Sequence, residues 1–109
     1  MQAALDALAE PRRREILDLV RDRELAAGEI AANFDITRPA ISQHLGVLKQ
    51  AGLLHERREG TKRLYRARPE GLAGLRDFLD DFWSDRLDAL TREAEHEQRR
   101  RNRERGSSN

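Results

Sequence analysis

The chain has 109 residues, of which 38% are hydrophobic and 38% are charged, and its formal net charge is +1. This length predicts one small domain with a modest core. Because the chain has no cysteine, disulfide bonds, thiolate metal sites and cysteine nucleophiles are excluded. No apolar run approaches the roughly 18 residues of a membrane span, and the N-terminus lacks the features of a signal peptide. We therefore expect a cytoplasmic protein without a membrane partner.

Two short helices are predicted at the N-terminus. Leu5 and Leu8 fall on one face of a helix over residues 3–9. Pro11 suits the first position of a second helix, where its missing N–H costs nothing. The aliphatic residues of this second helix share one face, and we expect them to be buried: Ile16, Leu17 and Val20.

The stretch from Thr37 to Gly52 is predicted to be the central helix. Thr37 is suited to cap its first turn, and Gly52 to end it in the left-handed conformation. A third helix over about 26–34 and a three-residue turn, 35–37, precede it, which predicts a helix-turn-helix. Asp35 stands where such turns usually place a left-handed glycine, a conformation that aspartate tolerates. The buried stripe of the central helix is expected to be Ile41, Leu45 and Leu48.

The opposite face of the central helix is polar. It carries Gln43 and Gln50, with Gly46 between them. Its flanks carry cations and short donors: Arg38, Ser42, His44 and Lys49. A helix anchored by aliphatic residues on one side, with donors and acceptors on the other, is suited to the major groove of DNA.

After Gly52 the spacing of the hydrophobic residues changes from that of a helix to that of β-strands. Residues 53–58 and 62–68 flank a loop at Gly60 and predict a β-hairpin. A lone hairpin is unstable, so it should pack on the helical core through Leu54, Leu64 or Tyr65.

A long helix is expected from Pro69 to about Glu95, and it closes a domain of residues 1–95. Its apolar stripe comprises Leu72, Leu75, Leu79, Trp83, Leu87, Leu90 and Ala94. Its opposite face carries Asp77, Asp81, Ser84, Asp88 and Glu95. The basic tail, 96–109, has no apolar residue and is expected to be disordered.

Charge is unevenly distributed along the chain. The segment from Ile36 to Arg68 holds eight cations and two acids, a net of +6, whereas Pro69 to Glu95 holds three cations and eight acids, a net of −5. Cations gathered around a helix that is suited to the major groove, and around the hairpin that follows it, are typical of phosphate binding.

The runs AEPRRREILDLV, PAISQHLGVLKQAGLL and ERREGTKRLYRARPEGL occur in this order between about Ala7 and Phe78. In this combination they resemble the ArsR-type winged helix-turn-helix repressors. The resemblance implies a homodimer that binds an imperfect palindrome in double-stranded DNA, usually at its own promoter, and blocks transcription. The reading helix would be Arg38–Gln50. One departure is Gly46, where the family commonly has Lys or Arg; it either permits close backbone approach or is a weak spot in the helix.

The DNA contacts that we expect lie on the reading helix and on the wing. They are Arg38, Ser42, Gln43, His44, Lys49, Arg58, Lys62 and Arg63. The arginines of the tail, from Arg99 to Arg105, either contact phosphates or keep the protein in solution.

No metal or cofactor is expected. The family's metal sensors use cysteines or paired histidines, whereas the last helix region offers only His96. Four aspartates share one helix face, which we interpret as a solvated surface: Asp77, Asp81, Asp85 and Asp88. Ser42 and His44 do not face each other on a helix, so no catalytic site is expected. The chain is similar to the metal-independent branch of the family.

The apolar stripe of the last helix extends beyond the reach of a core this small, so part of it should contact a partner helix. We expect a symmetric dimer through Leu5, Leu8, Leu75, Leu79, Phe82, Trp83, Leu87 and Leu90. Phe82 and Trp83 could instead line a small-molecule pocket between subunits, and no effector is identified. A winged-helix protein-interaction module without DNA binding is a further alternative. The predicted fold is mainly α with a small β-hairpin wing.

Overall fold

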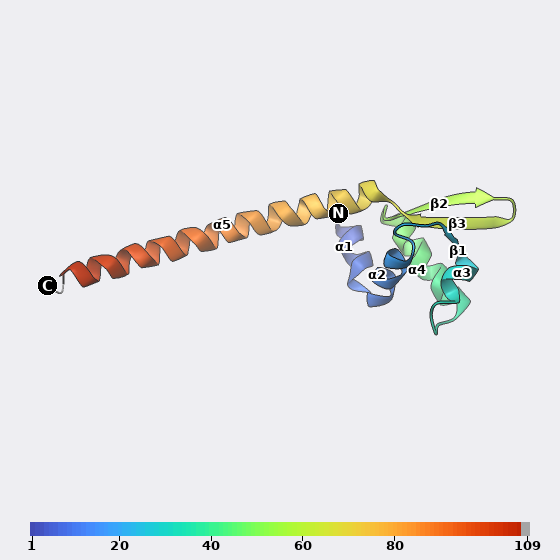
Figure 1. Ribbon diagram of the computed structural model, residues 1–109, viewed down its shortest axis with the longest axis horizontal. Helices are drawn as coiled ribbons and strands as arrows, with labels where there is room; N and C mark the ends of the chain where they lie inside the picture. The colour runs from blue at the N-terminus through green and yellow to red at the C-terminus, as the bar shows by residue number, and fades with distance from the viewer. Residues whose placement is uncertain (108–109) are drawn as a thin grey trace. The chain divides into compact units, whose positions relative to one another are not determined.

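A computed structural model describes residues 1–107, with side chains described through Arg103 (Figure 1). The chain forms two compact units, Met1–Leu75 and the part from Arg76 onward. The elements, in order, are α1 (Gln2–Ala9), α2 (Pro11–Leu19), β1 (Leu25–Ala26), α3 (Ala27–Ala31), α4 (Arg38–Gln50), β2 (Leu54–Glu59), β3 (Lys62–Ala67) and α5 (Pro69–Ser107). The predicted class, mainly α with a small β wing, is confirmed.

The core of the first unit is built around the buried side of α4. Ile41, Leu45 and Leu48 are 0%, 2% and 0% exposed, as their spacing predicted. The other helices and the segments that follow α2 and α4 supply further fully buried side chains: Ile16, Val20, Ile30 and Leu53. These contacts fix α4 on one side and leave its polar side facing outward.

Both ends of α4 form as the sequence predicted. The Thr37 hydroxyl accepts the Ala40 N–H at 3.3 Å, which satisfies one of the free donors of the first turn. At the other end Gly52 has φ +77°. The Gly52 N–H donates to the Lys49 carbonyl and the Leu53 N–H to the Leu48 carbonyl, both at 3.0 Å. This is a Schellman motif, which ends the helix sharply and turns the chain into β2.

The connection between α3 and α4 is longer than predicted. The third helix ends at Ala31, so six residues, 32–37, separate it from α4 rather than three. Among the described residues only glycines have positive φ, so the left-handed conformation expected at Asp35 is wrong. The chain reverses instead through right-handed turns, in which the Phe34 N–H donates to the Ala31 carbonyl at 3.1 Å.

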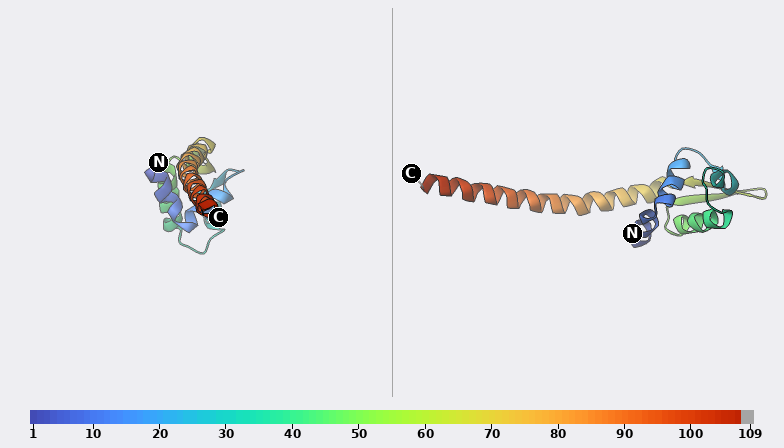
Figure 2. Two further views of the ribbon diagram at one scale, coloured as in Figure 1. Left: turned by 90° about the vertical axis from the view of Figure 1, so that its left-hand side faces the viewer. Right: turned by 90° about the horizontal axis from the view of Figure 1, so that it is seen from below.

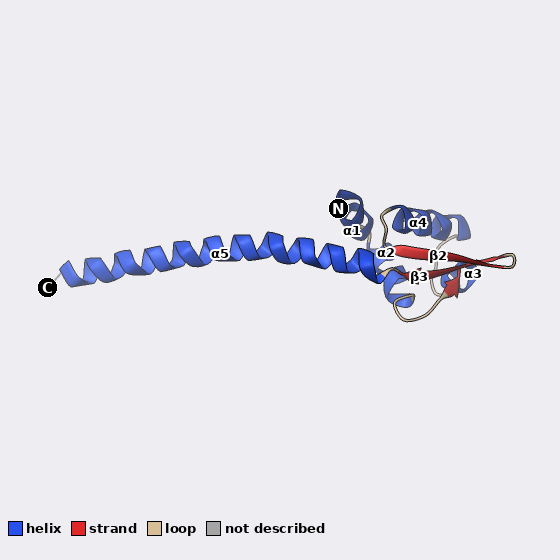
Figure 3. Cartoon of the chain, turned by 90° about the horizontal axis from the view of Figure 1, so that it is seen from above, coloured by secondary structure: helices blue, strands red, loops and turns tan. Residues whose placement is uncertain are grey.

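The hairpin is part of a three-stranded antiparallel sheet with the order β1-β3-β2 (Figure 3). In the two-residue strand β1, Leu25 pairs with Tyr65, so the sequence-based expectation of a two-stranded hairpin is corrected. Such a strand is too short to show a period of two. Tyr65 and Leu54 are buried, which confirms the expected packing on the core. The far end of β2 and β3 extends beyond the helices as a wing (Figure 2).

The first turn of α5 packs tightly on the end of α4. A Cβ atom at Gly71 would overlap the carbonyl oxygen of Gly52, whereas one at Gly74 would meet nothing within 4 Å. Leu75 is only 6% exposed and belongs to the core of the first unit.

The helix that follows is longer than predicted, because α5 continues to Ser107 instead of ending near Glu95. The expectation of disorder is therefore corrected for residues 96–107, and residues 108 and 109 lie outside the described part. Low hydrophobicity predicted disorder, but Glu, Gln and Arg are strong helix formers. Glu97 also pairs one turn ahead with Arg100 at 2.6 Å and with Arg101 at 3.4 Å. No helix in the described part of the chain has an apolar stretch long enough to cross a bilayer.

Candidate DNA-binding surface

The outward side of α4 and the wing line one groove of about 1210 Å³. It contains six of the eight predicted DNA contacts, from both elements: Arg38, Ser42, Gln43, Lys49, Lys62 and Arg63. Amides and a hydroxyl on one side therefore face cations on the other. This arrangement combines groups that can read base edges with groups that can bind phosphate.

Gly46 lies on the exposed side of α4 and lines the same groove. A Cβ atom there would meet nothing within 4 Å in the chain. No contact inside the described structure therefore requires a glycine at this position, although glycine lowers the stability of a helix interior.

Two of the predicted DNA contacts share a carboxylate that sequence reasoning missed. Glu56, whose side chain is 19% exposed, lies 3.1 Å from the Lys49 ammonium and 3.7 Å from Nε of Arg63. This acid joins α4 to the wing and partly neutralises the cations there. Burial, followed by the charge of Glu56, raises the pKa of Tyr65. Only the strand register places these groups together, because β2 pairs Glu56 with Tyr65 of β3.

The remaining wing cations lie near the hairpin turn. Arg58 pairs with Arg63 in the strand register, and Lys62 pairs with Glu59. Both Arg58 and Lys62 are exposed. Arg58 does not line the groove, although it lies directly across the strand pair from Arg63, which does.

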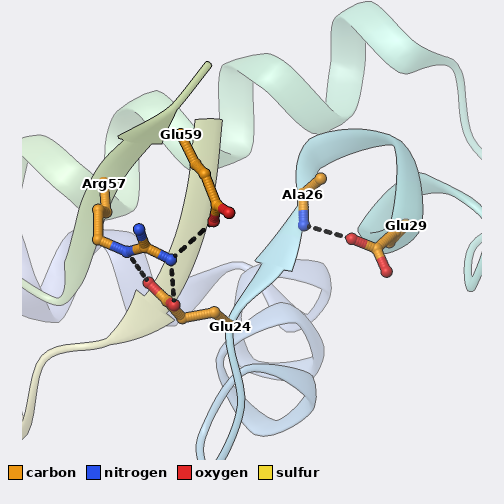
Figure 4. Close-up of polar contacts among 5 residues, drawn as sticks. All are labelled: Glu24, Ala26, Glu29, Arg57 and Glu59. Atoms are coloured by element: carbon orange, nitrogen blue, oxygen red, sulfur yellow. Dashed lines mark hydrogen bonds and ion pairs between the residues drawn. The ribbon is translucent and has the colours of Figure 1, made fainter. Parts of the chain in front are cut away.

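Arg57 serves the fold of the wing (Figure 4). Its Nε and Nη2 atoms donate to the two carboxylate oxygens of Glu24 at 3.0 and 2.9 Å, and Nη2 also donates to Glu59 at 3.0 Å. The hydrogen bonds from Arg57 lower the pKa of Glu24. This pair fastens the segment before β1 to β2. Beside it, the Ala26 N–H donates to Glu29 at 2.9 Å and begins α3 (Figure 4).

His44 lies on the flank of α4 outside the groove, and it is half-buried. Its Nδ1 accepts the Arg13 Nε–H at 3.2 Å. Nη1 of the same arginine donates to the carbonyl oxygens of Ala7 and Asp6 at the end of α1, at 3.4 and 3.5 Å. A ring that accepts at Nδ1 carries its proton on Nε2 when it is neutral. No described side-chain nitrogen is both buried and without a hydrogen-bond partner, so Nε2, for which no hydrogen bond is found, is not fully buried.

The apolar side chains predicted to form a dimer interface fall into two groups. Along the second unit, Leu79, Phe82, Trp83, Leu87 and Leu90 are 36–60% exposed although they are large and apolar. Leu5 and Leu8 are half-buried and pack on the core of the first unit. The buried Leu75 corrects its assignment to the interface, because its side chain is already used inside the chain.

The exposed apolar stripe is reinforced by aromatic contacts. The rings of Phe82 and Trp83 meet edge to face at 5.5 Å, and the Arg86 guanidinium lies 4.5 Å from the centre of the Phe82 ring. A contiguous apolar stripe of this kind marks an interaction surface. In the described part of the chain, no group of three or more His, Asp or Glu side chains is arranged to hold a metal ion.

Comparison with known proteins gives consistent matches. The family model described as "Bacterial regulatory protein, arsR family" matches residues 10–56. The chain is 48% identical over 81 residues to the HTH-type transcriptional regulator Rv2034 of Mycobacterium tuberculosis, covering 74% of this chain and 76% of that protein. It is 43% identical over 60 residues to the transcriptional repressor SdpR of Bacillus subtilis, covering 55% of this chain and 67% of that protein.

Among solved structures, the solution structure of Mb0332 from Mycobacterium bovis is similar. That fragment is described as a homodimeric winged helix-turn-helix DNA-binding domain of a possible ArsR-family regulator. It matches with a TM-score of 0.63 and 35% identity, over 79% of this chain and 80% of that chain.

Proposed function

This chain belongs to the arsR family of bacterial regulatory proteins, and we propose that it is a dimeric repressor that binds an imperfect palindrome in a promoter, including its own. One observation carries the proposal: the polar side of α4 and the cations of the wing line the same groove. The relatives support it, because SdpR is named a transcriptional repressor and Mb0332 a homodimeric DNA-binding domain. A role on bacterial DNA also implies that the protein works in the cytoplasm.

We assign two kinds of DNA contact to the site residues. Arg38, Ser42 and Gln43 approach base edges, because they lie on or beside the outward side of α4. His44 offers its Nε2–H from the flank to a phosphate or a base acceptor. The remaining cations bind backbone phosphates: Lys49, Arg58, Lys62 and Arg63. When Lys49 and Arg63 bind phosphate oxygens, their ion pairs with Glu56 must weaken.

Dimerisation is assigned to the apolar stripe of α5. Burying Leu79, Phe82, Trp83, Leu87 and Leu90 against a partner removes apolar surface from water, which is worth about 25 cal/mol per Å². A twofold dimer places two reading helices about 34 Å apart, one turn of B-DNA. No cofactor is assigned, and no small-molecule effector is identified.

The experiment that tests this function is a titration of the DNA upstream of the protein's own gene at several salt concentrations. We expect tight binding, a steep salt dependence and weak competition from random DNA. Binding no tighter than to random DNA contradicts repression of its own promoter. Absence of binding to any DNA would instead favour a protein-interaction module.

Two substitutions separate reading from phosphate binding. Gln43→Ala is expected to lower affinity at particular base pairs by about 1–3 kcal/mol and to relax sequence preference there. Lys62→Ala is expected to weaken binding to all DNA sequences alike. It should also reduce the slope of the logarithm of the binding constant against the logarithm of the salt concentration by about one unit. Equal losses on every sequence for Gln43→Ala would exclude it as a reading residue.

A further inference from the structure

The side of α5 opposite its apolar stripe carries an ordered row of charges. At about 100° per residue, nine charged or histidine side chains fall within an arc of about 100°, and Glu95 is one of them. The other eight form the charged stripe: Asp77, Asp81, Asp85, Asp88, Arg92, His96, Arg99 and Arg103. They recur at steps of three or four residues. The first four are acids, whereas the last four are three arginines and a histidine. All eight are exposed and lie in the second unit.

Among the residues whose side chains are described, 1–103, no member of the charged stripe forms an ion pair within 4 Å. The ion pairs of the described part of α5 beyond its first turn join Glu97 to Arg100 and Arg101, which lie outside the stripe. Asp77, Asp81 and Asp85 follow one another at steps of four, and like charges at this spacing destabilise a helix. The acidic half of the charged stripe therefore holds like charges that repel one another along the helix.

The order of these charges is largely self-complementary in an antiparallel pairing. If two copies of the helix meet about a twofold axis level with position 90, three of the four acids lie level with an arginine. The level pairs are Asp88 with Arg92, Asp81 with Arg99, and Asp77 with Arg103. Asp85 lies level with Glu95, so one pair of like charges opposes three attractive pairs. A twofold axis repeats every pair, so an isologous contact doubles the number of attractions.

We propose that the charged stripe of α5 binds the charged stripe of a second copy of this chain, antiparallel and centred on position 90. Charge complementarity along about 39 Å of helix, from Asp77 to Arg103 at 1.5 Å per residue, selects this partner. The apolar stripe lies on the other side of the helix and remains available. The two faces therefore bind different copies, and the proposal goes beyond the dimer proposed above.

Such pairing joins dimers into larger assemblies through electrostatic contacts. Individual exposed ion pairs contribute little, so the assembly depends on several pairs acting together and on low salt. The Debye length falls from about 10 Å at 0.1 M salt to about 3 Å at 1 M. The charged contact should dissociate over this range, whereas an apolar contact should persist.

Sedimentation velocity of the full chain, at about 0.1 M and about 1 M NaCl, measures this step. We expect the mass to double at the lower salt relative to the higher. Asp81→Arg replaces both symmetry-related attractions to Arg99 by repulsions, so the salt-dependent step should weaken by about tenfold. The double variant Asp81→Arg with Arg99→Asp exchanges the two charges and should restore it.

Asp80→Arg is the matched control. Asp80 is exposed on the same helix but lies about 110° from the centre of the stripe, and its substitution changes the net charge equally. We expect no change in the salt-dependent step. The measured quantity is the salt-dependent change in mass, which can be detected whether the species at high salt is a monomer or a dimer. The result therefore does not depend on the apolar dimer or on DNA binding.

Three results would overturn the proposal. The first is a mass that does not depend on salt in the wild-type chain. The second is an equal effect of Asp80→Arg and Asp81→Arg, or failure of the exchanged pair to restore association. The third is a loss of DNA affinity on Arg99→Asp with self-association unchanged, which would assign the basic half to DNA phosphates instead.

Discussion

Gly46 offers the most direct test of how α4 meets DNA. Its Cβ position is open in the chain, so Gly46→Ala should stabilise the folded state by about 0.5–1 kcal/mol, the usual gain in a helix interior. For a domain of this size the melting temperature should rise by roughly 2–8 °C. Thermal unfolding followed by circular dichroism, at matched protein concentration, measures this shift.

The same substitution places a methyl group in the groove that Gly46 lines. If the DNA backbone or a base approaches α4 closely there, affinity for the specific site should fall by about tenfold, or about 1.4 kcal/mol. Stability and DNA affinity therefore change in opposite directions. We expect a gain in stability together with a loss of DNA affinity. No contact within the described structure requires glycine at position 46, so a contact with DNA is the reason we infer for it.

Gly74→Ala is the control, since its Cβ position is equally open and it does not line the groove. It should raise the melting temperature without changing DNA affinity. Undiminished DNA affinity in Gly46→Ala refutes the close approach and marks Gly46 as a weak spot in the helix. Absence of a stability gain in both variants refutes the argument from helix propensity.

Three further predictions follow from contacts in the first unit. Gly71→Ala overlaps a carbonyl oxygen in the turn that ends α4, so thermal unfolding should show a loss of about 1–3 kcal/mol. The pKa of Glu24 is lowered by the hydrogen bonds from Arg57. The ionised Glu24 side chain therefore stabilises the folded state at pH values above its unfolded-state pKa, and this stabilisation is lost as the pH falls through its folded-state pKa. Glu24→Gln should therefore lower the melting temperature at neutral pH, and the difference should shrink below about pH 4. Arg13→Met removes the donor to Nδ1 of His44, so nitrogen NMR of the neutral ring should show partial protonation of Nδ1, and DNA affinity should fall several-fold.

Arg14→Met is the matched control for the histidine. Nη1 of Arg14 donates to the Leu8 carbonyl at 2.6 Å, so this variant also loses a bond to the end of α1 but leaves His44 untouched. It should not change the ring spectrum. Equal changes in both variants would show that the ring responds to α1 rather than to Arg13. In a His44→Ala background, Arg13→Met should cause no further loss of DNA affinity if it acts through the ring.

Local signals in the sequence were sufficient for the reading helix. Thr37, Gly52 and the spacing of Ile41, Leu45 and Leu48 each act within one or two helical turns, and each was confirmed. The hairpin was predicted from the strand-like pattern of the residues on either side of a loop that contains Gly60. The DNA contacts assigned to these elements remain predictions.

Features that depend on distant parts of the chain were missed. A strand of two residues has no readable period, so β1 is defined only by its pairing with β3. Glu56 and Arg13 were assigned no role, because their partners are six or more residues away in sequence. Composition also predicted disorder after Glu95, whereas helix propensity and local ion pairs favour the continued helix.

The contact between Gly71 and Gly52 has a mechanical consequence. With no side chain on either glycine, the first turn of α5 rests directly on the turn where α4 ends. The first turn of α5 and the end of the reading helix thus form one closely packed junction inside the first unit. Any side chain at position 71 would have to push these two turns apart. The end of the reading helix therefore depends on a glycine that lies 19 residues further along the chain.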